Sequence, residues 1–222
     1  MTVTERALAD LVDRYPWLPF VAPFALFIGL TAVQQGVPGG VVWVYPLKAV
    51  LTGAYIVALA RWLKAPGAPF AFAAAAVGVA VLLVWVLSDG LYPLLDARPA
   101  FDPYRELQRS QAYVWIAMRL VGAAVIVPIA EEFFWRGFLI RWLVSPDFRS
   151  VRMGTFTWYS FLATSALFAV EHDRWLAGLI AGVAYNGLYY RTRSLKACIL
   201  AHGVTNLGLG IYVLVGNQWR FW

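Results

Sequence analysis

Three long stretches without Lys, Arg, Asp or Glu limit the possible folds of this chain more than any other feature. They lie between Arg14 and Lys48, between Lys64 and Asp89, and between Lys196 and Arg220. Over the whole sequence 61% of the residues are hydrophobic and 14% are charged, whereas soluble domains contain about a quarter charged residues. Because so much apolar surface cannot all be buried inside a water-facing globule, part of it must face lipid.

Structures that span a membrane satisfy their backbone hydrogen bonds internally, so helices and closed barrels are the possible folds. The sequence lacks the alternating pattern of barrel strands, and a chain of 222 residues accommodates about seven or eight helical spans. We therefore predict an all-α, polytopic transmembrane helical bundle of about seven to eight spans that forms one membrane-embedded domain over residues 1–222. The predicted spans are residues 17–34, 41–62, 69–87, 121–143, 155–172, 175–190 and 195–215, with a weaker helix at 111–120 ahead of the fourth span and a short surface helix within the polar connection 88–110.

The net charge of +6 is explained by basic residues that flank the spans and attract anionic lipid, rather than by binding to nucleic acid. Lys and Arg concentrate on the cytoplasmic side of membrane proteins, and this rule predicts a cytoplasmic N-terminus and a C-terminus outside. The residues then predicted to lie inside are Arg6, Arg14, Arg61, Lys64, Arg141, Arg149, Arg152, Arg191, Arg193 and Lys196, and those outside are Arg98, Arg105, Arg109, Arg174 and Arg220.

A pair of glutamates is the most conspicuous polar group within a predicted span. Glu131 lies ten residues into the span 121–143, which is ~15 Å along a helix and therefore near mid-membrane. Glu132 and Arg136 are four residues apart, so they can pair on one helix face and leave Glu131 as a free carboxylate. The alternative is an interfacial salt bridge at a helix end without a catalytic role.

The chain has two histidines, and both fall in or next to predicted spans. His172 follows Phe168 by four residues, and Asn206 follows His202 by one helical turn. A lone histidine in a membrane helix usually packs helices together. Two histidines, an asparagine and a Glu-Glu-Arg cluster on three late helices instead predict a shared polar site, because ionisable groups inside a membrane are costly and mark function.

These side chains suit the hydrolysis of an amide bond. A carboxylate in a low-dielectric pocket is a competent general base near neutral pH. Histidine can share the proton or hold the attacking water, and a neutral histidine N–H and an asparagine amide can donate to a developing oxyanion.

Three ordered motifs resemble those of a known family. Glu131-Glu132-x-x-x-Arg136, Phe168-x-x-x-His172 and His202-x-x-x-Asn206 look like the signatures of the CAAX prenyl protease and bacteriocin-processing family, which are glutamate-type intramembrane proteases related to the Ras-converting enzyme. The resemblance covers about residues 115–210. It implies that Glu131 is the catalytic base, that His172 helps to position and activate water, and that His202 and Asn206 stabilise the oxyanion. Arg136 would orient the acidic pair of Glu131 and Glu132.

The same resemblance implies a membrane-associated protein or peptide substrate and no cofactor. The opening Tyr15-Pro16-Trp17-Leu18-Pro19-Phe20 is similar to a bacterial subgroup found with exosortase protein-sorting systems. We therefore expect an integral, multi-pass protein of the bacterial inner membrane.

Other classes fit the residues less well. Glu131 and the two histidines could form a three-ligand zinc site, but a His-Glu-x-x-His motif is missing and Asn206 suits a hydrogen bond better than a metal. A transporter would favour repeated halves, which the sequence lacks, and a non-catalytic scaffold would use these groups to pack helices. Cys198 could act as a thiol nucleophile, although a buried cysteine is usually a small apolar residue.

Two details are open at this stage. Straight spans place His172 near the outer end of its helix, Glu131 at the centre and His202 nearer the inner end, so either the helix 155–172 starts deeper or the site is a funnel. Lys48 and Arg119 also lie within or near spans, where they can snorkel, pair helices or bind the carboxylate terminus of a substrate.

Overall fold

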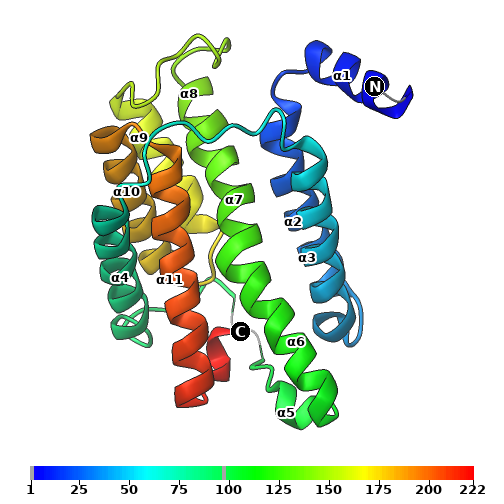
Figure 1. The fold of residues 1–222 in the computed structure, drawn as a ribbon. Helices are drawn as coiled ribbons and strands as arrows, with labels where there is room; N and C mark the ends of the chain where they lie inside the picture. The colour runs from blue at the N-terminus through cyan, green and yellow to red at the C-terminus, as the bar shows by residue number, and fades with distance from the viewer. Residues whose placement is uncertain (1–2, 97–98) are drawn as a thin grey trace.

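The computed structural model describes residues 3–96 and 99–222, and within them every regular element is a helix. The long helices run side by side as a bundle (Figure 1), which confirms the all-α prediction. In chain order the elements are α1 (Val3–Arg14), α2 (Leu18–Gly36), α3 (Gly40–Leu59), α4 (Ala71–Leu87), α5 (Pro103–Glu106), α6 (Arg109–Val121), η1 (Gly122–Ile126), α7 (Val127–Glu132), η2 (Phe133–Leu139), α8 (Ile140–Trp142), α9 (Trp158–Val170), α10 (Trp175–Thr192), α11 (Leu195–Gly216) and η3 (Trp219–Phe221).

Four helices in the described part of the chain are long and apolar enough to cross a membrane, namely Leu18–Gly36, Gly40–Leu59, Arg109–Trp142 and Leu195–Gly216. Ala71–Leu87 and Trp158–Val170 are apolar but shorter. Large apolar side chains such as Trp43, Phe72 and Val215 are exposed on the outer surface of the bundle, where lipid would cover them. The chain is therefore a polytopic helical membrane protein, but the predicted number of seven to eight spans is not confirmed.

One long helix replaces the predicted weak helix 111–120 and the span 121–143. Arg109–Trp142 is continuous over 34 residues, and it changes to π-helical hydrogen bonding at Gly122–Ile126 and again at Phe133–Leu139. Pro128 lies between these segments and has no N–H to donate, so the regular i to i−4 pattern cannot run through this region. Such π-helical turns are rare and occur frequently at functional sites. Here they flank the two glutamates.

The long helix separates two groups of helices. α2 and α3 pack on each other on one side, whereas α4, α9, α10 and α11 gather on the other (Figure 1). Glycine permits a close approach within the larger group, because a Cβ atom at Gly78 would lie 2.5 Å from the carbonyl oxygen of Ala201. This contact between α4 and α11 also brings the carbonyl of Gly78 within 2.8 Å of the Thr205 hydroxyl.

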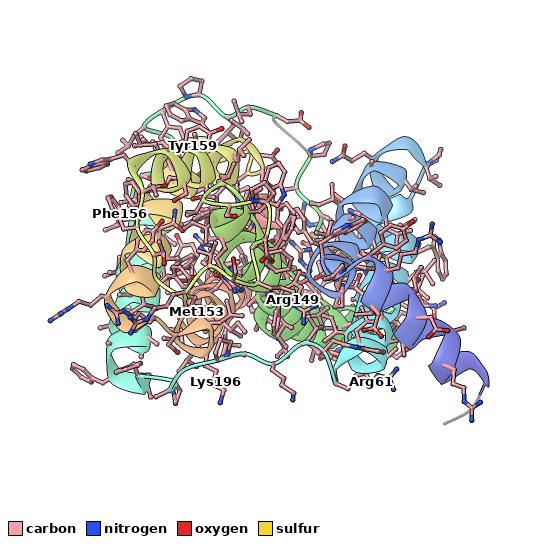
Figure 2. The ribbon with its side chains drawn as sticks, turned by 90° about the horizontal axis from the view of Figure 1, so that it is seen from above. Arg61, Arg149, Met153, Phe156, Tyr159 and Lys196 are labelled. Carbon is pink, nitrogen blue, oxygen red and sulfur yellow. The ribbon has the colours of Figure 1, made fainter. Side chains whose placement is uncertain are left out.

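The two ends of the bundle differ in charge. The N-terminal helix and the links 60–70 and 143–157 lie at one end (Figure 1), where Arg61, Arg149 and Lys196 are found (Figure 2); we call it the basic end. The other end, which we call the C-terminal end, carries the C-terminus and α5, the short helix predicted from the sequence. At this end Asp89 forms ion pairs with Arg174 at 2.7 Å and with Arg220 at 2.9 Å. The predicted orientation rests on the same division of basic residues between the two sides of the membrane. Arg98, one of the residues predicted to lie outside, is not among the described residues.

Candidate active site

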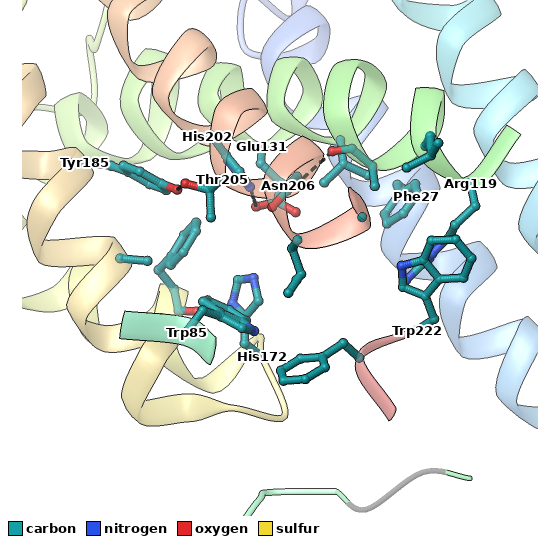
Figure 3. Close-up of a pocket in the computed structure, with 18 of the residues that line it drawn as sticks. Phe27, Trp85, Arg119, Glu131, His172, Tyr185, His202, Thr205, Asn206 and Trp222 are labelled. Carbon is teal, nitrogen blue, oxygen red and sulfur yellow. Dashed lines mark hydrogen bonds and ion pairs between the residues drawn. The ribbon is translucent and has the colours of Figure 1, made fainter. Parts of the chain in front are cut away.

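The four predicted catalytic side chains line one cavity. Glu131 on α7, His172 in the turn after α9, and His202 and Asn206 on α11 surround a space of about 220 Å³, which we call the central cavity (Figure 3). Phe27 on α2 and Tyr45 on α3 contribute the opposite wall, so the cavity lies between the two groups of helices. An adjoining space of about 840 Å³, the outer cavity, shares Glu131 and His172 and reaches the C-terminal end at residues that include Asp96, Phe101, Glu106 and Arg220.

The length of α9 explains how His172 reaches this depth. The helix has 13 residues, and at ~1.5 Å per residue it extends only ~20 Å from the basic end. The predicted helix 155–172 was too long at both ends, so the apparent mismatch in depth between His172 and Glu131 does not arise. The ring of Phe168 lies 4.8 Å from the ring of His172 and 6.1 Å from the ring of His202, and it packs between the two histidines.

A backbone carbonyl fixes the tautomer of His172. Its Nδ1 lies 2.8 Å from the carbonyl oxygen of Phe168, and because a carbonyl oxygen can only accept, Nδ1 carries the hydrogen. Burial lowers the pKa of His172, which lies in the turn outside the spans, to about 4. The ring is therefore neutral at pH 7, and Nε2 has a free lone pair that can accept a hydrogen bond from water.

A buried network holds Glu132. Arg136 donates from Nη1 to Glu132 Oε1 at 2.9 Å, as the sequence spacing predicted, and from Nε to Asn186 Oδ1 at 2.9 Å. Asn186 on α10 in turn donates to the hydroxyls of Thr164 and Ser165, each at 3.0 Å. Asn186 was not predicted from the sequence, because one amide in an apolar helix is indistinguishable from a helix-packing group.

His202 lies between the two glutamates. Its Nδ1 is 3.0 Å from Glu132 Oε1 and its Nε2 is 4.0 Å from Glu131 Oε2. The carboxylate of Glu132, already bound to Arg136, accepts from Nδ1–H, so a neutral ring would have no hydrogen at Nε2. With the hydrogen at Nδ1, a hydrogen bond from Nε2 to an oxyanion would require a second hydrogen on the ring.

Tyr185 supports the His202 ring from α10. The two rings stack at 5.3 Å between centroids with an interplanar angle of 25°. The Tyr185 hydroxyl donates to Thr205 Oγ1 at 2.7 Å. Both residues line the central cavity, and neither was predicted from the sequence.

Glu131 and Asn206 present free polar atoms at the cavity. Glu131 Oε2 is buried and makes no hydrogen bond to any group in the described residues. Asn206 donates from Nδ2 to the carbonyl oxygen of Ala123 at 2.9 Å. An amide nitrogen carries two hydrogens, so the second one is not committed to this bond.

Comparison with known proteins agrees with the motifs. Residues 113–208 match the family described as type II CAAX prenyl endopeptidase, Rce1-like. We call residues 113–208 the Rce1-like segment. The Rce1-like segment contains all three motifs and runs from α6 to α11, and the family implies CAAX-type intramembrane endopeptidase activity. The search of curated proteins and the search of solved structures gave no match.

Another buried carboxylate of the Rce1-like segment, Glu171, was not predicted as a site residue. Glu171 precedes His172, lines the outer cavity and has a buried Oε2 without a hydrogen-bond partner among the described groups. Burial raises its pKa to about 8. The nearby indole N–H of Trp135 lowers the pKa of this carboxyl, although it forms no hydrogen bond with it. The sequence does contain a signal that could have identified Glu171, namely an acidic residue at the end of an apolar run.

The zinc alternative needs at least three protein ligands arranged around one ion. Within residues 3–96 and 99–222, no group of three or more His, Cys, Asp and Glu side chains is arranged to hold a metal ion. Cys198 is buried with its Sγ 3.6 Å from the carbonyl oxygen of Tyr185, and it does not line the central cavity of the Rce1-like segment.

Proposed function

We propose that this protein is a glutamate-type intramembrane endopeptidase that hydrolyses a peptide bond near the terminus of a membrane-associated protein or peptide. The observation that carries the proposal is the position of Glu131. Glu131 lines the same cavity as His172 and His202, its Oε2 makes no hydrogen bond to a described group, and that oxygen lies 4.0 Å from Nε2 of His202. A carboxylate, an accepting imidazole and nearby donors around one cavity are the groups that activate water and stabilise an oxyanion.

In this mechanism a water molecule donates hydrogen bonds to Glu131 and to Nε2 of His172. Glu131 takes a proton as the water oxygen bonds to the carbonyl carbon, and negative charge moves to the carbonyl oxygen. The imidazolium of His202 and the second N–H of Asn206 stabilise that charge. Glu131 then passes its proton to the nitrogen of the leaving amine as the carbon–nitrogen bond breaks.

Glu132 has a positioning role in this proposal. Its Oε1 accepts from both Arg136 and His202, so it holds the ring of His202 in place. Arg136 offsets the charge of Glu132, and Asn186 fixes the guanidinium from α10. No metal ion or other cofactor takes part in any of these steps.

We further propose that the substrate reaches the site from the non-cytoplasmic side of the bacterial inner membrane. The outer cavity extends from Glu131 to the C-terminal end of the bundle, whereas Arg61, Arg149 and Lys196 lie at the basic end (Figure 2). The enrichment of Lys and Arg on cytoplasmic faces assigns the basic end to the cytoplasm.

Membrane vesicles of known sidedness test both parts of the proposal. Internally quenched, membrane-anchored peptides would be added to right-side-out and inside-out vesicles from bacteria that express the protein. We expect cleavage, identified by mass spectrometry, in right-side-out vesicles and none in vesicles that carry the Glu131→Gln variant. Absence of Glu131-dependent cleavage in both preparations, with folded protein present, would contradict the enzyme assignment. Cleavage confined to inside-out vesicles would contradict the assigned face alone.

A further inference from the structure

A further carboxyl group lies next to the proposed site, and the steps proposed for Glu131 do not involve it. Glu171 lines the outer cavity together with Glu131 and His172. Its Oε2 is buried and forms no hydrogen bond with a described group. This carboxyl therefore keeps its hydrogen-bonding capacity for a group that enters the cavity.

The backbone at the end of α9 holds Glu171 close to the turn of the long helix that carries Glu131. The Glu171 N–H donates to the carbonyl oxygen of Leu167 at 3.3 Å, so this residue completes the last turn of α9. The indole N–H of Trp135 lies near the Glu171 carboxyl, and Trp135 follows Glu131 by four residues on one helix face. The carboxyl groups of Glu171 and Glu131 are also close enough to interact electrostatically. Two carboxyl groups from different helices thus border the same part of the cavities.

Glu171 holds its proton at neutral pH. Burial raises its pKa to about 8, although the positive charge of Arg136 opposes this effect. The ionisable groups of the elements around it are Glu131, Glu132 and Arg136 on the long helix, His202 on α11, and His172, Asp173 and Arg174 in its own turn and just after it. A neighbour that keeps its proton lets Glu131 act as an ionised base without a further negative charge beside it.

Amide hydrolysis needs two proton transfers as well as the attack of water. The base takes a proton from the water as the water oxygen bonds to the carbonyl carbon, and the amine nitrogen needs a proton as the carbon–nitrogen bond breaks. A single carboxyl must serve both positions in turn. A second carboxyl that already holds a proton can serve the nitrogen while the first holds the proton of the water.

We propose that Glu171 is a further catalytic residue, the acid that protonates the leaving amine. Its carboxyl gives a proton to the nitrogen as the carbon–nitrogen bond breaks, and the resulting carboxylate receives the proton that Glu131 took from the water. The products are a carboxylic acid and an amine, Glu131 is again a carboxylate, and Glu171 is again protonated. This inference rests on the proposed function of Glu131, and it gives the route by which the proton of Glu131 reaches the amine.

A comparison of peptide and ester cleavage by the Glu171→Gln variant tests the inference. An amide nitrogen must be protonated to leave, whereas 4-nitrophenolate leaves without a proton. We expect the variant to cleave the peptide bond of a membrane-anchored peptide ~10²–10⁴-fold more slowly than the wild type. It should cleave the matching 4-nitrophenyl ester at nearly the wild-type rate, after spontaneous hydrolysis is subtracted.

The pH dependence of kcat/KM gives a second readout. Because the proposed acid must hold its proton, peptide cleavage by the wild type should fall as pH rises above about 8. The residual peptide cleavage by Glu171→Gln should lack this fall. A fall of the same size in the variant would overturn the proposal.

Glu106→Gln is the matched control. Glu106 is an exposed glutamate that lines the same outer cavity, and its change to glutamine should leave the cleavage of both substrates unaltered. Melting temperatures would show that each variant is folded. Equal losses toward peptide and ester in Glu171→Gln would overturn the acid role, because a disturbed cavity slows both reactions. Undiminished peptide cleavage by Glu171→Gln would overturn it as well.

Failure of this inference can be told apart from failure of the proposed hydrolase. Glu131→Gln removes the base that both reactions need, so it should slow peptide and ester cleavage alike. Peptide cleavage that Glu131→Gln leaves unchanged would contradict the hydrolase mechanism. A loss in Glu131→Gln, with no difference between peptide and ester in Glu171→Gln, would contradict the role of Glu171 alone.

Discussion

His202 contacts the two glutamates unequally, with Nδ1 at 3.0 Å from Glu132 Oε1 and Nε2 at 4.0 Å from Glu131 Oε2. The short contact is a hydrogen bond, whereas the longer one leaves room for a substrate atom to approach Nε2. Adjacent residues of one helix thus make different contacts. Glu132 is tied to Arg136 and His202, and Glu131 keeps an unpartnered oxygen at the cavity.

Arg136→Ala should destabilise the protein as well as inactivate it. The guanidinium is fully buried and binds Glu132 and Asn186, so its loss leaves a buried charge without its partner, at a cost of roughly 3–5 kcal/mol. Thermal unfolding in detergent would measure the effect. Arg105→Ala is the control, because the Arg105 side chain is 86% exposed in its ion pair with Asp102 and such pairs contribute about 0–1 kcal/mol. Equal melting temperatures for wild type and Arg136→Ala would contradict this account of the network.

Asn206→Ala should separate catalysis from stability. The variant loses the hydrogen bond to the Ala123 carbonyl and, in the proposed mechanism, one donor to the oxyanion. Loss of one such donor lowers kcat on the order of 10²–10³-fold. We expect a small change in melting temperature and little change in KM. A variant whose KM rises while kcat stays at the wild-type value would place Asn206 in substrate binding and not in transition-state stabilisation.

Glu171 makes stability depend on pH. Burial raises its pKa in the folded protein from an ordinary value of 4.5 to about 8. Below pH 4.5 both the folded and the unfolded chain hold the proton, and between pH 4.5 and about 8 the unfolded chain has released it while the folded one has not. The free energy of unfolding therefore falls as pH rises through this window.

The Glu171→Gln variant removes this titration. Its melting temperature, relative to the wild type, should rise progressively from pH 5 to pH 8 and level off above pH 8. Glu106→Gln, a change at an exposed glutamate, should show no such trend. If the difference in melting temperature between the wild type and Glu171→Gln were the same at pH 5 and pH 9, this result would contradict a buried Glu171 that retains its proton.

Metal removal tests the remaining mechanistic alternative. Purified protein should keep its full peptidase activity after exhaustive treatment with a chelator, because in the proposed mechanism Glu131 activates the water. The assay would compare cleavage rates before and after chelation and after addition of zinc. Activity that disappears on chelation and returns only with zinc would favour a metalloprotease.

The sequence predicted the chemical groups better than their geometry. Glu131, His172 and His202 stood out because ionisable groups are rare in apolar helices, and the structure brings them to one cavity. Asn186 and Thr205 did not stand out, because small polar groups in such helices usually serve packing. The length of α9 and the π-helical turns depend on tertiary packing, so a hydropathy pattern could not give the depth of His172 or the continuity of Arg109–Trp142.

The central claim is that Glu131 activates water, and the Glu131→Gln variant tests it most directly. The substitution keeps the size of the side chain and removes the base, whose loss typically costs ~10²–10⁴-fold in rate. Single-turnover cleavage of a membrane-anchored peptide would be compared for wild type and variant with matched melting temperatures. The account predicts a folded variant with at least a ~100-fold lower cleavage rate, whereas cleavage by the folded variant at the wild-type rate would contradict it.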